Sequence, residues 1–117
     1  MRFFKLFRKR KTLAGELFFS NEFLITGASH FCTKNVKKKR RNVIKHKKPG
    51  ALVYLEKYMH EDSVGYMVID PKTGLDLGVL TPNAASWIYE KCNNTCVRCH
   101  LTKRDGDSFR ILVNAYH

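Results

Sequence analysis

The sequence predicts a mostly β protein: a single small OB-like β-barrel with one or two short helices. Short runs of branched and aromatic residues recur along the chain and alternate with clusters of Gly, Pro, Asn and Asp, which is typical of strands and turns. Helix-start chemistry is clear at one place only, Thr81 and Pro82. The length of 117 residues suits one domain. Together these observations favour a small barrel.

Residues 1–20 are expected to form a basic and aromatic N-terminal segment, followed by a barrel domain over residues 21–117. Met1–Lys11 alternates large apolar with basic residues, and Phe3, Phe4 and Phe7 share a helical face. An amphipathic helix, a strand and a loose tail all remain open for it. It lacks the apolar core of a signal peptide, and no apolar run approaches the ~20 residues that span a bilayer. We therefore expect an intracellular protein, in the cytoplasm or, in a eukaryote, the nucleus.

The first half of the barrel is expected to contain two strands. Leu17–Thr26 is rich in aromatic and branched residues and predicts the first strand. Gly27 then indicates a bulge or a close backbone approach, and Ala28–Cys32 is expected to continue as an extended segment. After the turn at Pro49 and Gly50, Ala51–Leu55 alternates like a strand. A loop is expected over residues 57–61.

The second half begins with a hairpin. Strands are predicted over Gly65–Ile69 and Leu75–Leu80, because Asp70–Gly74 between them has Pro at its second position and Gly at its end. The helix that begins at Pro82 should end before Asn93, with Trp87 and Ile88 facing the core. The last two strands are expected over Thr95–Thr102 and Ser108–Tyr116.

Positive charge is concentrated in the first half of the chain. Residues 1–50 hold 15 Lys and Arg against 2 Glu, a net charge of +13, whereas residues 51–117 hold 7 basic against 8 acidic residues, a net charge of −1. Much of the excess lies in a basic insert at residues 33–49, which we expect to be a mobile loop or a poorly anchored helix until a polyanion neutralises it. The side chains expected to grip phosphates are Lys37, Lys38, Lys39, Arg40, Arg41, Lys45, Lys47 and Lys48.

Nucleic acid is the partner that this charge favours, and an acidic membrane or protein surface, or no partner at all, remain open. Residues 37–41 also match a nuclear localisation pattern, which any nucleic-acid-binding loop would match equally well. No order of Ser, His and Asp, no Gly-rich phosphate loop and no paired carboxylates stand out. We therefore expect a protein that is not an enzyme and needs no cofactor.

Four cysteines lie in a chain without an export signal, so reduced thiols are expected. Cys92, Cys96, Cys99 and His100 are the donors of a possible structural zinc site. Their spacing is tighter than in ribbons and fingers, which take ligand pairs from two separate turns. In a strand, Cys99 and His100 also point to opposite faces, and a free Cys packs as a small apolar residue. We expect no metal here, and zinc stays the weaker alternative.

Several segments occur in an order that resembles the HIRAN domain family. Phe23–Phe31 is similar to the first strand, glycine and polar-aromatic pair of that family. Pro49–Leu55 resembles the strand before its signature loop, and His60–Val68 resembles the loop itself, where an aspartate precedes a small residue and a strand. Gly78 and the helix from Pro82 match the next elements of the family. The resemblance covers about Phe23–Tyr116, and the basic insert has no counterpart in the family core.

The resemblance implies a small β-barrel module that holds the 3′ end of single-stranded DNA. In DNA-binding members, aromatic side chains stack on the terminal bases and the signature aspartate accepts a hydrogen bond from the 3′ hydroxyl. Carried over, Asp62 reads the hydroxyl, and His30 and Phe31 lie where bases stack. Tyr58 is a further stacking candidate. A stacked π-face tolerates any base, and a carboxylate repels a continuing phosphate.

The sequence supports two functions. The first is a non-enzymatic DNA-binding module that recognises single-stranded DNA or its 3′ end and grips phosphates through the basic insert. The alternative is an interaction protein, of a phage or mobile-element type, that binds a host protein through its basic and Phe-rich N-terminal half.

Overall fold

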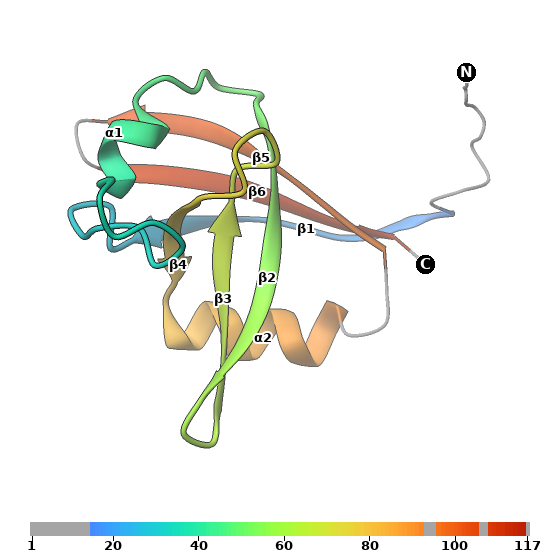
Figure 1. Cartoon of the computed structure of the whole chain (residues 1–117). Coiled ribbons are helices and arrows are strands. Elements are labelled where there is room, and N and C mark those ends of the chain that lie inside the picture. The colour runs from blue at the N-terminus through green and yellow to red at the C-terminus, as the bar shows by residue number, and fades with distance from the viewer. Residues whose placement is uncertain (1–14, 93–95, 106–107, 117) are drawn as a thin grey trace.

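Six strands and two short helices make up the part of the protein that the structure describes (Figure 1). The computed structural model describes residues 15–92, 96–105 and 108–116, so the helix considered for Met1–Lys11 lies outside the described residues. The strands close into one antiparallel barrel, which confirms the predicted fold class. The elements are β1 (Leu17–Thr26), α1 (Arg40–Ile44), β2 (Leu52–His60), β3 (Ser63–Ile69), β4 (Asp76–Leu80), α2 (Pro82–Cys92), β5 (Cys96–Asp105) and β6 (Ser108–Tyr116).

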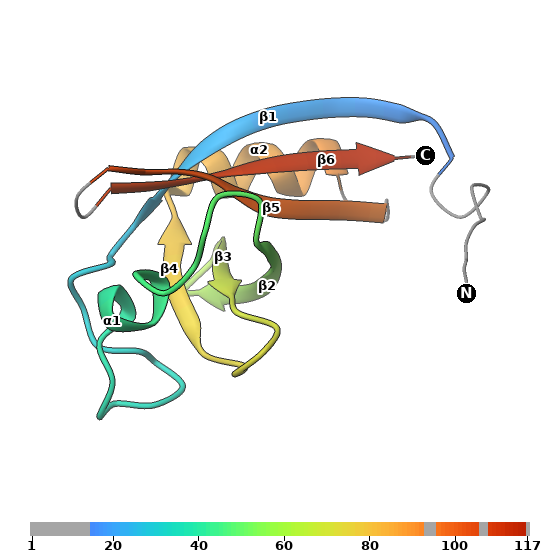
Figure 2. The same cartoon turned by 90° about the horizontal axis from the view of Figure 1, so that it is seen from above.

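The barrel closes through β1, which lies between β4 and β6 in the strand order β1-β4-β3-β2-β5-β6 (Figure 2). β1 pairs with β6 from Leu17, opposite Tyr116, to Ile25, opposite Phe109. The first barrel strand therefore begins at Leu17, as the sequence predicted. Its contact with β4 is short, consisting of Ile25 with Leu80 and Thr26 with Val79.

Alternating apolar side chains of the strands fill the barrel, and α2 adds its own apolar face. On β6, for example, Phe109, Ile111 and Val113 are all buried. α2 contributes Ala85, Ile88 and Cys92, which recur at the spacing of one helix face. Other members of the core are Ile25, Val53, Val68, Leu77 and Leu101.

The prediction that Trp87 faces the core is wrong, whereas the same prediction for its neighbour Ile88 is confirmed. The Trp87 side chain is 39% exposed. The ring packs edge-on against Phe19 and Phe23 of β1, with ring centroids 4.9 and 6.1 Å away. Successive helical residues point about 100° apart, so the turn that buries Ile88 directs Trp87 toward β1.

The hairpin of β2 and β3 is longer than expected. The predicted loop over residues 57–61 is mostly strand, because β2 pairs with β3 as far as His60 opposite Ser63. Glu61 turns the chain there with a φ of 56°. Within the hairpin, Tyr58 of β2 lies opposite Gly65 of β3. An added Cβ at Gly65 would stand 2.4 Å from the Tyr58 Cζ. This position therefore favours glycine.

Local signals placed the next two features correctly. In the β3–β4 turn, the Gly74 N–H donates to the Asp70 carbonyl at 2.8 Å, and Gly74 has a φ of 76°. At the start of α2, the Ala84 N–H donates to the Thr81 hydroxyl at 3.2 Å, and Pro82 is the first helical residue. The predicted turn and helix start are both confirmed.

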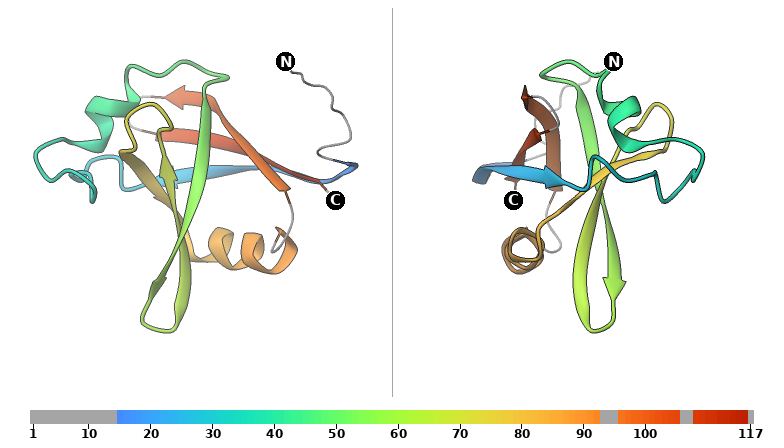
Figure 3. Two further views of the ribbon diagram at one scale, coloured as in Figure 1. Left: turned by 45° about the vertical axis from the view of Figure 1, so that its right-hand side comes forward. Right: turned by 90° about the vertical axis from the view of Figure 1, so that its left-hand side faces the viewer.

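The two helices lie apart on the barrel. α1 lies at the end opposite the tip of the β2–β3 hairpin, and α2 runs across the barrel nearer to that tip (Figure 3). The basic insert and the hairpin tip, both of which the sequence associates with DNA, therefore lie at different ends of the molecule.

Candidate nucleic-acid interface

The basic insert between β1 and β2 is packed onto the barrel. It first turns back on itself, because the Cys32 N–H donates to the Lys38 carbonyl at 2.7 Å and the Arg40 N–H donates to the His30 carbonyl at 3.0 Å. α1 then begins with buried Arg40 and ends with fully buried Ile44. The expectation of a poorly anchored segment is therefore wrong, and so is the expectation that the chain stays extended up to Cys32.

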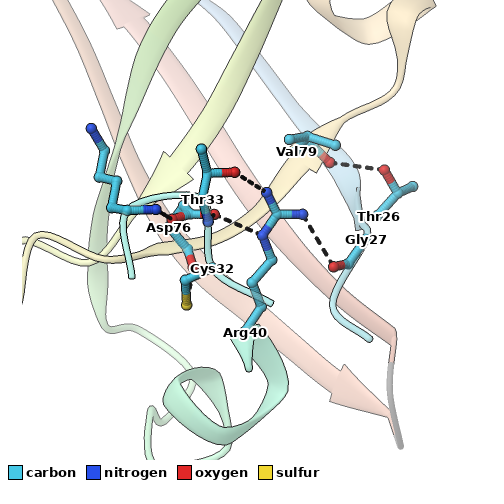
Figure 4. Close-up of polar contacts among 8 residues, drawn as sticks. Thr26, Gly27, Cys32, Thr33, Arg40, Asp76 and Val79 are labelled. Carbon is cyan, nitrogen blue, oxygen red and sulfur yellow. Dashed lines mark hydrogen bonds and ion pairs between the residues drawn. The ribbon is translucent and has the colours of Figure 1, made fainter. Parts of the chain in front are cut away.

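Arg40 and Asp76 form the main attachment of the insert (Figure 4). The Arg40 Nε lies 2.8 Å from the Asp76 Oδ2, and both side chains are almost fully buried. The same carboxylate accepts the backbone N–H groups of Thr33 (2.8 Å) and Lys34 (2.9 Å). The guanidinium also donates to the Gly27 carbonyl and the Thr33 hydroxyl, both at 3.2 Å. Arg40 therefore uses its donors inside the protein and does not face a phosphate.

This network keeps the Asp76 carboxylate ionised. Burial alone would raise the pKa of Asp76, but the hydrogen bonds from Thr33, Lys34 and Arg40 outweigh burial and lower it. The position of the Arg40 guanidinium also explains the glycine at residue 27. Gly27 has a φ of 79°, and an added Cβ would stand 2.8 Å from the Arg40 Nη1. The glycine expected at a close backbone approach is thus in contact with the buried arginine.

A second ion pair fixes the far end of the insert to the β3–β4 turn. The Lys47 Nζ lies 2.7 Å from the Asp70 Oδ1, and the Asp70 side chain is 1% exposed. Asp70 also accepts the Thr73 hydroxyl at 2.7 Å and the Lys72 N–H at 3.2 Å. Burial would raise the pKa of Asp70, yet the bonds from Lys47, Thr73 and Lys72 lower it overall.

Between the insert and this turn lies a groove with basic walls. One part, of about 450 Å³, has Val43 and Leu75 among its apolar lining residues, and the adjoining part is about 340 Å³. Both parts include His46, Lys47 and Asp70. Asp70 is the only acidic residue among the described residues that line them. We define the basic groove by its basic lining residues, Lys37, Lys38, His46, Lys47, Lys48 and Lys72.

The predicted phosphate-binding residues separate into groups. Lys37, Lys38, Lys47 and Lys48 line the basic groove. Lys39 instead places its Nζ 5.4 Å from the centroid of the Phe31 ring. Arg41 and Lys45 are exposed on and next to α1 but line neither part of the groove.

His46 and Lys72 belong to the basic groove although the sequence did not identify them. His46 is next to predicted lysines, so its place in the basic run was a usable signal. Lys72 lies in a turn whose residues are explained by turn geometry alone. Nothing in the local sequence places it beside Lys47, because the Lys47–Asp70 contact joins two distant segments.

The residues of the implied 3′-end pocket are not brought together. His30 and Phe31 lie just before the insert, whose first residues, Thr33 and Lys34, bind Asp76 at the start of β4. Asp62 lies at the tip of the β2–β3 hairpin, directly before Ser63, the first residue of β3. Asp76 pairs with Ile69, which is six residues from Ser63 along β3. At ~3.3 Å per residue, the two ends of β3 are therefore on the order of 20 Å apart, and Asp62 and Asp76 lie near opposite ends.

Asp62 and Tyr58 have other surroundings. Asp62 lines a groove of about 380 Å³ between the hairpin and α2, together with Lys57, Met59 and Tyr89. Tyr58 packs against Gly65 in the same hairpin. Neither residue lines the basic groove, and neither lies in the segment that carries His30 and Phe31.

The cysteines do not gather into a metal site. In the described part of the chain no group of three or more His, Cys, Asp or Glu side chains is placed to hold a metal ion. Cys99 is buried in the core, whereas Cys96 is exposed, so the two faces of β5 separate them. Burial, with a contribution from Cys92, raises the pKa of Cys99 to about 12. None of the four cysteines forms a disulfide.

Comparisons of the chain with protein-family models, with curated proteins and with solved structures found no match. The resemblance to HIRAN domains therefore stays a prediction from the sequence. Across residues 15–92, 96–105 and 108–116, no helix is long and apolar enough to cross a membrane.

Proposed function

We propose that this protein is a non-enzymatic nucleic-acid-binding module, with DNA as its ligand, that holds phosphates in the basic groove. One observation carries the proposal: lysines from the insert and from the β3–β4 turn line two adjoining hollows, which share His46, Lys47 and Asp70. Their single acidic lining residue among those described, Asp70, is already paired with Lys47. A phosphate chain in this groove meets cations without meeting a free carboxylate.

Electrostatics favours a polyanion over a small neutral ligand. The chain carries a net charge of +12. A cleft lined by one sign of charge focuses the field and raises the local concentration of the opposite charge. Lysines act as point charges that do not depend on base identity. Binding through them releases counterions, so affinity should fall steeply as salt rises.

The proposal assigns nucleic-acid binding to the basic groove rather than to a 3′-end pocket. A pocket of the kind that the HIRAN resemblance implies needs stacking rings and a carboxylate around the same terminal nucleotide. His30 and Phe31 instead lie far from Asp62 along the barrel. The barrel then serves as the scaffold that holds the two lysine-bearing segments side by side.

Fluorescence anisotropy with labelled oligonucleotides, between about 50 and 200 mM salt, tests the proposal. The key variant is Lys48→Gln with Lys72→Gln, which removes two charges from the basic groove. Lys91→Gln with Arg110→Gln removes two exposed charges from α2 and β6 and is the matched control. We expect the first variant to reduce the slope of log K against log salt by about 1.4–1.8, and the control to change it little.

Two results would contradict the proposal. Equal losses in the two variants would show that net charge alone governs binding. No binding at low salt would exclude nucleic acid and favour a protein partner, as in the alternative drawn from the sequence. Melting curves of both variants, followed by circular dichroism, establish that each remains folded.

A further inference from the structure

The outer face of β2 continues the basic groove with exposed apolar side chains. Leu52 lines the groove together with Lys48 and Lys72 and is 67% exposed. Tyr54 is two residues further along, on the same face of the strand, and is 47% exposed. At ~3.3 Å per residue, the two side chains leave the strand about 7 Å apart. A ligand leaving the groove along β2 meets Leu52 and then Tyr54.

Tyr54 also stands at the edge of an opening in the barrel. β2 pairs with β5 only through Leu52 with His100 and Val53 with Cys99, and from Tyr54 onward the two strands diverge. A pocket of about 280 Å³ lies where they separate. Leu55, Tyr66 and Val97 line it together with Tyr54. The ring of Tyr54 therefore lies between a lysine-lined groove and a mainly apolar pocket.

The ring of Tyr54 lacks the neighbours that cover three other exposed rings. Phe31 lies under Lys39, Tyr89 lies under Lys57 at 5.3 Å, and Trp87 packs against Phe19. Within the described residues, Tyr54 has neither a ring contact nor a cation over it. Across the strands it lies opposite Ile69, which is fully buried.

We propose that Leu52 and Tyr54 form a base platform, on which bases of a single-stranded nucleic acid stack while its phosphates lie in the basic groove. The proposal rests on the proposed function and adds a second, uncharged part to the same interface. An exposed aromatic ring stacks on the π-face of any base, whereas a duplex keeps these faces inside its own stack. The platform thus selects single strands, and the lysines alone do not.

Anisotropy with a single-stranded oligonucleotide and with a duplex of the same length tests the platform. We expect Tyr54→Ala to weaken single-strand binding by about 5- to 150-fold, which is the range for loss of one stacked base. Duplex binding and the salt dependence should stay as in the wild type, because no phosphate contact is lost. Tyr54→Phe keeps the ring and should bind like the wild type. Tyr89→Ala, which removes a tyrosine of similar exposure (41%), is the matched control.

The outcomes separate the two proposals. If the wild type binds with a steep salt dependence but Tyr54→Ala binds single strands equally well, the platform is wrong and the groove proposal stands. The platform is also wrong if Tyr89→Ala causes the larger loss, or if Tyr54→Ala weakens duplex and single strand alike. If the wild type binds neither ligand, both proposals fail. A thermal melt of Tyr54→Ala confirms that any loss comes from a folded protein.

Discussion

The Nε of Arg40 lies 2.8 Å from the Oδ2 of Asp76 and joins the first residue of α1 to the first residue of β4. The Asp76 carboxylate also accepts two backbone N–H groups of the insert. One buried carboxylate thus fixes the course of the insert from Thr33 to Arg40. The position of the lysines later in the insert depends on this contact.

Arg40→Ala should destabilise the protein by about 3–5 kcal/mol, because it leaves the Asp76 charge buried without its cation. Urea unfolding at neutral pH measures the loss. Glu56→Gln breaks the exposed Lys34–Glu56 pair, in which the two side chains are 35% and 38% exposed, and should cost at most about 1 kcal/mol. Equal costs in the two variants would mean that the buried pair does not anchor the insert.

Acid should weaken the fold through Asp70 and Asp76. Both carboxyls have pKa values below the ordinary 3.8 in the folded protein. The stability that they contribute is therefore fully present above pH 3.8 and is lost as the pH falls through the lowered pKa values. In Asp70→Asn the contribution of Asp70 is absent at every pH. The stability gap between wild type and this variant should shrink as the pH falls below 3.8, and a constant gap would contradict the assignment.

The thiols should differ sharply in reactivity. Burial raises the pKa values of Cys32, Cys92 and Cys99, and only Cys96 is exposed. A thiol reagent at neutral pH should label Cys96 rapidly and the other three only after denaturation. Cys96→Ser should abolish the fast phase. A chelator should leave the melting temperature unchanged, and release of stoichiometric zinc would contradict the separation of Cys96 from the buried cysteines.

A 3′ phosphate should not impair binding. Oligonucleotides with a free 3′ hydroxyl and with a 3′ phosphate should bind equally and with the same salt dependence, because the basic groove contacts phosphates along the chain. Asp62→Ala should leave both affinities unchanged. A preference for the free hydroxyl that disappears in Asp62→Ala would instead place the 3′ end at the hairpin tip, as the HIRAN resemblance implies.

Features determined by neighbouring residues were predictable from the sequence. The β3–β4 turn depends on Asp70, Pro71 and Gly74, and the start of α2 depends on Thr81 and Pro82, so each signal lies within five residues. The alternation of apolar residues likewise predicted the fold class. Such features require no knowledge of what packs against them.

Features determined by distant contacts were not predictable. Arg40 sits in a run of like charges, and its partner Asp76 is 36 residues away, so composition alone assigned it to the solvent. A loop was expected over residues 57–61, yet pairing with β3 makes residues 57–60 part of a strand. Tyr54 was identified only as a strand residue, because its place beside the opening depends on where β5 diverges.

The pairing of Leu17 with Tyr116 has a practical consequence for handling the protein. The start of β1 and the end of β6 lie at one corner of the barrel, and α1 lies away from that corner (Figure 2). A fluorophore, a surface tether or a fused carrier attached there would leave the lysine-lined side facing the solvent. The same geometry suits insertion into a surface loop of another protein, because the host chain can enter and leave at neighbouring points.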